Sequence, residues 1–104
     1  MAAYMIVDVD VRDAAAYEDY KRGVEPFIAK HGGVYLVRGG DFEILEGDWR
    51  PTRLVIFRFP DRESVHAFLD DPDYQRLKAL RRRVATTSAI VVEGLEEKSD
   101  EVTK

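Results

Sequence analysis

The sequence predicts an α+β fold in which helices cover one face of a single sheet. Three observations support this fold class. Residues 4–11, 34–38 and 53–59 are apolar or alternate with a period of two, as strands do. Residues 14–31 and 62–84 instead carry apolar side chains at helical spacing. A chain of 104 residues has room for one domain, which we place at residues 1–95.

The composition excludes several kinds of chemistry. The chain has no Cys, so it has no disulfides, thiolate nucleophiles, iron–sulfur clusters or thiolate zinc sites. It shows no basic leader before an apolar run, and no stretch approaches the ~20 apolar residues of a membrane span. We therefore expect a cytoplasmic protein without a membrane partner. A net charge of −4 also argues against nucleic acid as a partner, because binding to phosphates requires positive charge. The basic run Arg81 to Arg83 is explained by its place at the end of a predicted helix, where cations are favourable.

The first strand is expected over residues 4–11, and a long helix follows it. Asp13 can cap the helix, and Gly32 with Gly33 can end it. Pro26 removes a backbone donor and Gly23 weakens the same turn, so we expect a kink or break between them. The buried stripe of this helix is expected to contain Tyr17, Tyr20, Val24, Phe27, Ile28 and His31.

Three further strands are expected in the middle of the chain. The first covers residues 34–38, and a turn at Gly39 and Gly40 leads to a short strand at residues 42–46. Residues 47–51 are expected to form a loop. The most apolar strand covers residues 53–59, and Pro60 closes it.

Two helices and a last strand complete the domain. Asp61 is expected to cap the second helix, and Asp71 with Pro72 to start the third, with Pro72 at its first position. The last strand is expected at residues 88–93. The acidic tail, residues 96–104, has almost nothing to bury and is expected to be disordered.

This order of elements fits a ferredoxin-like βαββαβ sandwich with its helices on one face. The other face of such a sheet is usually polar, but here Leu54 and Ile56 alternate with Val55 and Phe57, so both faces are apolar. The face without helices needs a partner, and a second copy of the chain is the simplest one. We therefore expect a homodimer.

Three segments resemble a known family. They are HGGVYLVRGG at residues 31–40, LEGDWRP at 45–51 and DPDYQRLKALR at 71–81. They are similar to the family called domain of unknown function 1330, and the resemblance extends from Tyr4 to Leu95. It implies a dimeric α/β barrel, in which two ferredoxin-like sheets pair and each keeps a pocket under its own helices. Because that superfamily includes monooxygenases, isomerases, cyclases and haem enzymes, the resemblance implies no single chemistry and no catalytic residues.

His31 and Arg38 are the candidate catalytic residues. His31 lies on an apolar stripe and could move a proton, although a histidine at a helix C-terminus can also simply cap carbonyls. Arg38 shares a strand face with Val34 and Leu36 and could hold a carboxylate or an enolate. Structural ion pairs, Asp8 with Arg38 or Glu46 with Arg53, would explain the same charges without a ligand.

Four aromatic residues are candidates for binding a substrate. Tyr17, Tyr20 and Tyr74 could point their hydroxyl groups into one cavity between helices and sheet, or satisfy them on backbone carbonyls. Trp49, in the loop at residues 47–51, could close a pocket or anchor a partner subunit.

Metal and cofactor sites are not expected. The two histidines have no ligand spacing, and His66 is expected to face solvent. The glycine pairs do not have the spacing of a phosphate-binding loop. Three functions therefore stay open: an enzyme without cofactor acting on a small carbonyl or phenolic compound, a noncatalytic or stress-associated dimer that binds a ligand, and a purely structural partner domain.

Overall fold

The computed structural model describes residues 1–95. In chain order it contains β1 (Ala3–Val11), α1 (Ala14–Lys30), β2 (Val34–Arg38), β3 (Leu54–Phe59), α2 (Arg62–Asp70), α3 (Gln75–Val84) and β4 (Ala85–Glu93). The tail that the sequence predicts to be disordered, residues 96–104, lies outside the described residues.

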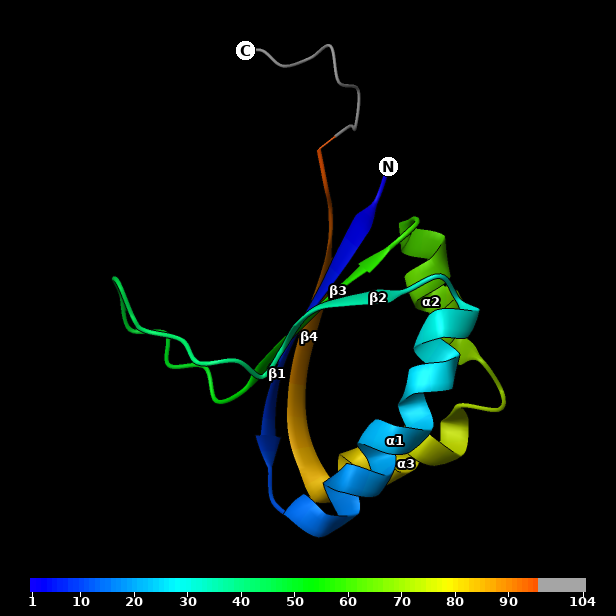
Figure 1. Cartoon of the computed structure of the whole chain (residues 1–104), viewed down its shortest axis with the longest axis horizontal. Coiled ribbons are helices and arrows are strands. Elements are labelled where there is room, and N and C mark those ends of the chain that lie inside the picture. Colours follow the sequence, from blue (N-terminus) through cyan, green and yellow to red (C-terminus); the bar gives the residue numbers. More distant parts are fainter. Residues whose placement is uncertain (96–104) are drawn as a thin grey trace.

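The four strands form one sheet in the order β2-β3-β1-β4, and every pair is antiparallel. All three helices lie on the same side of this sheet (Figure 1). The predicted α+β, ferredoxin-like fold is therefore confirmed. The two central strands are β1 and β3, which are also the most buried, because a central strand is covered by neighbours along both edges.

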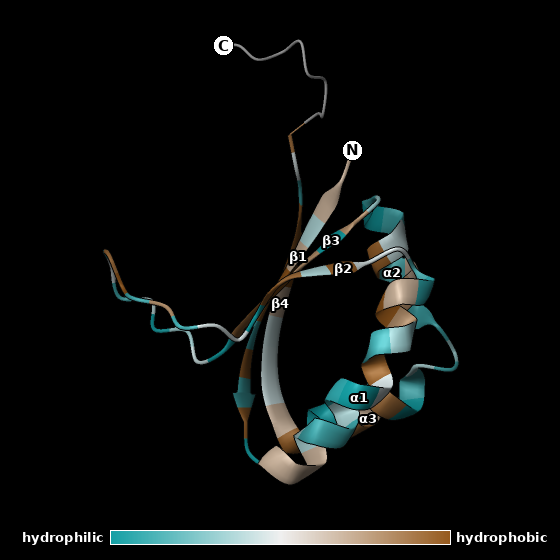
Figure 2. Ribbon diagram, in the orientation of Figure 1, coloured by the Kyte–Doolittle hydropathy of each residue, from teal (hydrophilic) through white to brown (hydrophobic). Residues whose placement is uncertain are grey.

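The core lies between the sheet and the helices. The alternate residues Met5, Val7 and Val9 of β1 point into it, and Phe59 and Phe68 are almost fully buried there. Figure 2 shows helices that carry both hydrophilic and hydrophobic residues along their length. This pattern is the amphipathic one that a helix on one face of a sheet requires.

Helix α1 begins and ends at the residues that the sequence indicates. The Asp13 carboxylate accepts a hydrogen bond from the backbone N–H of Ala16, and the N–H of Gly33 donates to the carbonyl of Ile28 at 2.8 Å. The helix is continuous from Ala14 to Lys30, so the break expected between Gly23 and Pro26 does not occur. Packing of its buried face holds the helix together across the missing donor of Pro26.

The prediction of a short strand at residues 42–46 is wrong. Residues 40–53 instead form an irregular extension, here called the arm, which projects from the sheet on the side away from the helices (Figure 1). The alternation of Phe42 and Ile44 resembles a strand, but no strand within residues 1–95 pairs with this segment. Without a ladder of hydrogen bonds, the pattern alone does not make a strand.

The expected start of the third helix is also wrong. Helix α3 begins at Gln75, not at Pro72, because the Asp71 carboxylate accepts a hydrogen bond from the N–H of Asp73 and the Asp71 carbonyl accepts one from the N–H of Tyr74. These bonds make residues 71–74 a turn. Strand β4 begins at Ala85, directly after α3 and three residues before the expected Ser88, because Val11 and Asp10 of β1 pair with its first residues.

The face of the sheet away from the helices is apolar along one complete row. Across the strands, Val37 pairs with Ile56, Ile56 with Ile6, and Ile6 with Ile90. Ile90 is 62% exposed and Val37 is 37% exposed. Four β-branched side chains therefore form a continuous strip that nothing in the described chain covers.

Candidate functional site

A cavity lies between the sheet and the three helices. The cavity volume is about 90 Å³, and the atom-free space reaches about 680 Å³ when the open mouth is counted. Its floor is the helix-side face of the sheet, including Val7, Val55 and Phe57, and its wall includes Val24 and Phe68 from the helices. Such a lining favours the apolar part of a ligand.

Two tyrosines place their hydroxyl groups in this cavity. The hydroxyl oxygens of Tyr20 on α1 and Tyr74, just before α3, are 2.7 Å apart and share a hydrogen bond, and both residues are buried. Tyr17 stacks on Tyr20 with 5.6 Å between the ring centres. All three predicted tyrosines therefore line one cavity, as the helix period of Tyr17 and Tyr20 suggested.

Burial changes the chemistry of Tyr20. Burial, followed by the nearby Tyr74 hydroxyl, raises the pKa of Tyr20 well above its usual value. Tyr20 is therefore a neutral phenol that can donate a hydrogen bond. Arg81 of α3, half-buried, lines the same part of the cavity and places a permanent positive charge there. Together these groups can stabilise a negatively charged oxygen.

Arg38 lies at the mouth of the cavity. Its guanidinium stacks on the ring of Tyr35, 3.7 Å from the ring centre, and makes a 3.0 Å ion pair with Glu25 of α1. A β-bulge between Tyr35 and Val37 places Arg38 opposite Val55, on the helix side. The expectation that Arg38 shares a face with Val34 and Leu36 is wrong for this reason.

The structural ion pairs considered from the sequence do not form within residues 1–95. The Asp8 carboxylate accepts hydrogen bonds from the backbone N–H groups of Thr52 and Arg53, at 2.9 and 3.3 Å. Asp8 therefore holds the base of the arm, and it does not pair with Arg38. Arg53 makes no ion pair with Glu46, which lies on the exposed arm.

Arg53 is a cavity residue that sequence reasoning missed. It precedes β3 and shares the face of Val55 and Phe57, so its half-buried side chain points toward the helices. A Cβ atom on Gly39, whose φ is +72°, would collide with the Arg53 guanidinium. The alternation of Arg53 with Val55 and Phe57 was the signal that could have identified it.

His31 lies outside the cavity lining. Its Nε2 is 2.8 Å from an Asp71 carboxylate oxygen, and the Lys30 ammonium donates to the same oxygen at 2.8 Å. The hydrogen bonds from Lys30 and His31 hold the pKa of Asp71 well below its usual range. The Asp71 side chain is only 2% exposed, so this cluster ties the end of α1 to the turn before α3.

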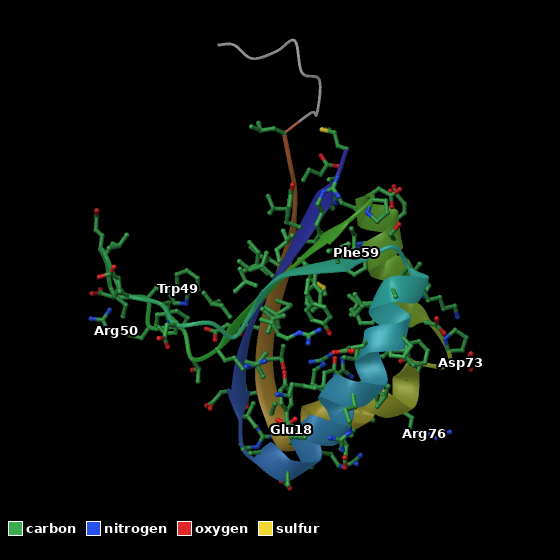
Figure 3. The ribbon with its side chains drawn as sticks, viewed as in Figure 1. Glu18, Trp49, Arg50, Phe59, Asp73 and Arg76 are labelled. Carbon is green, nitrogen blue, oxygen red and sulfur yellow. The ribbon has the colours of Figure 1, made fainter. Side chains whose placement is uncertain are left out.

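Trp49 also lies outside the cavity. Figure 3 places Trp49 and Arg50 on the arm, away from the helices. Trp49 is 63% exposed and lines a shallow hollow on the arm together with other apolar side chains. His66 is exposed on α2, as expected.

Within residues 1–95, no group of three or more His, Asp or Glu side chains is placed to hold a metal ion.

None of the helices in the described part of the chain is long and apolar enough to cross a membrane.

The fold is similar to several solved structures. A Rhodopseudomonas palustris protein of unknown function, RPA0582, has a TM-score of 0.73 at 22% identity, covering 91% of this chain and 83% of that one. SnoaB, described as a cofactor-independent oxygenase from Streptomyces nogalater, has a TM-score of 0.64 at 13% identity, with 94% and 97% covered. A dimeric ferredoxin-like protein of unknown function from Jannaschia sp. CCS1 has a TM-score of 0.62 at 12% identity, with 90% and 100% covered. At these identities the likeness is one of fold.

The sequence itself matches one family model over most of its length. The model of the domain of unknown function DUF1330 covers residues 2–95. No curated protein matches the sequence.

Proposed function

Because the chain belongs to the DUF1330 family, whose description assigns no function, we propose a function from its cavity. The protein binds a small, mostly apolar molecule that carries an oxygen function, such as a carbonyl or phenolic compound. The cavity between the sheet and the three helices is the binding site. This proposal goes beyond the fold, which is shared by proteins of many activities.

One observation carries the proposal: polar donors stand inside an otherwise apolar cavity. The hydroxyl groups of Tyr20 and Tyr74 and the guanidinium of Arg81 meet a surface of aliphatic and aromatic side chains. A cavity kept only for packing would be filled by its own side chains, since protein interiors are close-packed. An open cavity with a few converging polar groups is typical of ligand sites.

A ligand screen by thermal shift tests the proposal, with Ala89→Phe as the key variant. Ala89 lines the cavity from β4, and a phenyl group there would occupy the space of the ligand. A ligand that raises the melting temperature of the natural protein should have no effect on Ala89→Phe, whereas Ala89→Ser should respond normally. A ligand that stabilises all three proteins equally would bind elsewhere and contradict the proposal.

A second, narrower function is catalysis without a cofactor on the bound compound. The similarity in fold to SnoaB, described as a cofactor-independent oxygenase, favours it. In such a reaction Tyr20 would donate a hydrogen bond to the substrate oxygen, Arg81 would balance its charge, and Glu25 of the lining would accept a proton. Arg38 would hold the substrate at the mouth, and His31 has no part because it lies outside the lining.

Oxygen uptake with a panel of hydroxynaphthalenes tests this narrower function. Tyr20→Phe should lower the rate by about 100-fold, because it removes one donor to the developing oxyanion. Arg50→Gln, on the arm and remote from the cavity, should leave the rate unchanged. A rate no higher than that of protein-free buffer across the panel would refute catalysis of this kind and leave binding as the function.

The protein is also proposed to act as a homodimer through the face of the sheet away from the helices. The strip of Val37, Ile56, Ile6 and Ile90 lies on that face, and a two-fold axis would pair it with the same strip of a second copy. A similar fold is described as dimeric in the Jannaschia protein. Sheet pairing of this kind would make the dimeric α/β barrel that the family resemblance implies.

The position and the side chains of the arm also favour a second copy of the chain as the partner. It projects on the side of the sheet where the second copy would lie (Figure 1). It exposes Phe42, Ile44, Leu45 and Trp49, of which Leu45 is 87% exposed. Large apolar side chains on an extension are typical of interface anchors, so the arm is proposed to pack on the partner subunit.

A further inference from the structure

We propose that one end of the cavity is an anion subsite, so that the ligand is an aromatic monocarboxylate whose carboxylate binds Arg53 and Thr87. This inference rests on the proposed function, because it names the ligand class of the same cavity. It is carried by the charge of the lining, by two buried polar atoms without partners, and by the way in which Gly39 shapes the subsite.

The lining carries more positive than negative charge. It includes Lys21, Arg38, Arg53 and Arg81, but only one acid, Glu25. Glu25 pairs with Arg38 at 3.0 Å, and Lys21 pairs at 2.8 Å with Glu18, outside the lining.

Arg53 and Arg81 remain without a carboxylate partner in the described part of the chain. Glu18 lies close enough that Arg53 contributes to lowering its pKa, although the hydrogen bond from Lys21 contributes most. That carboxylate is already engaged by Lys21. A bound anion would therefore meet two guanidinium groups whose charge no acid within residues 1–95 neutralises by direct contact.

Two polar atoms at the same end of the cavity are buried without a hydrogen-bond partner. They are Nε of Arg53 and Oγ1 of Thr87. Buried polar groups in folded proteins almost always have partners, so two orphans in one cavity indicate a missing polar group. A ligand carboxylate, with one oxygen toward each atom, would satisfy both.

The register of the sheet places these two residues in one row. Thr87 of β4 pairs with Val9 of β1, and the N–H of Val9 donates to the carbonyl of Arg53 at 2.9 Å. Arg53 and Thr87 therefore flank Val9 from its two sides, and all three line the cavity. Val9 supplies an apolar floor between the two polar groups.

Gly39 leaves the space that the Arg53 guanidinium occupies. The backbone of Gly39 approaches the guanidinium so closely that a Cβ atom would collide with it, and its φ of +72° is one that other residues rarely adopt. The N–H of Gly39 also donates to the carbonyl of Leu54 at 2.7 Å, which holds β2 beside Arg53. The guanidinium thus lies against the backbone of Gly39, where any larger residue would compete for its place.

The remaining lining selects the rest of the ligand. A planar guanidinium matches a planar carboxylate with two parallel hydrogen bonds. Most of the remaining wall is apolar and aromatic, including Phe57, Phe68 and Tyr17, which suits one flat ring system. An aromatic monocarboxylate has both parts.

Calorimetry with two probes of nearly equal shape tests the subsite: 2-naphthoate, which is charged, and 2-naphthamide, which is neutral. The natural protein should bind the naphthoate at least 10-fold more tightly. Arg53→Gln should remove most of this preference, and Thr87→Val should reduce it, because each loses one donor. Arg50→Gln, a matched change on the arm, should keep the full preference.

The possible results separate the inference from the proposed function. Equal binding of both probes by the natural protein would overturn the anion subsite and leave the binding function standing. An unchanged preference in both Arg53→Gln and Thr87→Val would likewise overturn it. If the natural protein binds neither probe, the result would count against the proposed function and the subsite together. If Arg53→Gln does not fold, as judged by circular dichroism, the isosteric Thr87→Val alone decides.

Discussion

At the scale of single residues, Asp71 illustrates how one buried carboxylate can organise several elements. It joins Lys30 and His31 at the end of α1 to the turn at residues 71–74. The sequence marked His31 as a catalytic candidate because a histidine lay on an apolar stripe. Its acceptor stands 40 residues later in the chain, so only the folded structure reveals the pairing.

Asp71→Asn should make stability less dependent on pH in acid. The pKa of Asp71 is lowered on folding, so its charged form stabilises the folded state fully above the ordinary value of about 3.9, and this contribution is lost as the pH falls through the lowered folded value. Urea unfolding should show the variant clearly weaker than the natural protein at pH 7, with a gap that narrows below about pH 4.

Asp73→Asn, at an exposed position in the same turn, is the matched control and should change the free energy of unfolding by no more than about 0.5 kcal/mol. A gap between Asp71→Asn and the natural protein that stays constant from pH 7 to pH 2 would contradict the role given to the Asp71 charge.

Arg38 and Arg53 mark the limits of sequence reasoning at this scale. Strict alternation put Arg38 on the wrong face, because the bulge at Leu36 adds one residue that no composition signal announces. Arg53 followed the alternation faithfully but was read as half of an ion pair. Tyr17 and Tyr20 were predictable because they recur at the same helical spacing as Val24 and Ile28, the other core residues of α1.

At the scale of elements, four strands and three helices could be predicted because each has its own period and its own stop signals. The arm could not be predicted, because a strand requires a neighbour to pair with, and the local pattern of a segment does not show whether such a neighbour lies beside it. Phe42 and Ile44 alternate as strand residues do, yet they are exposed on an extension with no pairing partner among the described strands.

Shortening the arm should separate folding from assembly. A variant in which a two-residue Asn-Gly turn replaces residues 42–50 keeps Thr52 and Arg53, which bond to Asp8. Its helical circular dichroism should be unchanged, because the arm projects away from the helices (Figure 1). Its dimer dissociation constant, measured by sedimentation equilibrium, should rise at least 10-fold, or about 1.4 kcal/mol. A loss of folded structure would show instead that the arm belongs to the core of its own chain.

At the scale of the whole molecule, the two faces of the sheet have different tasks. The helix side forms the core and the cavity, and the other side presents a strip that residues 1–95 leave uncovered. The sequence already indicated this division, since Leu54 and Ile56 alternate with Val55 and Phe57. Each copy would thus keep its own cavity while sharing the opposite face of its sheet.

Ile90→Arg should convert a dimer into single chains. Ile90 stands at the exposed end of the strip, and in a dimer its replacement would bury a guanidinium without a partner. Sedimentation equilibrium at about 10 μM should give the natural protein a mass near twice 11.9 kDa and give the variant a mass near 11.9 kDa. Ala67→Arg, which adds the same charge at an exposed position of α2, should stay dimeric. If the natural protein sediments as a single chain, the sheet does not pair as proposed, and the strip must be explained by a different partner.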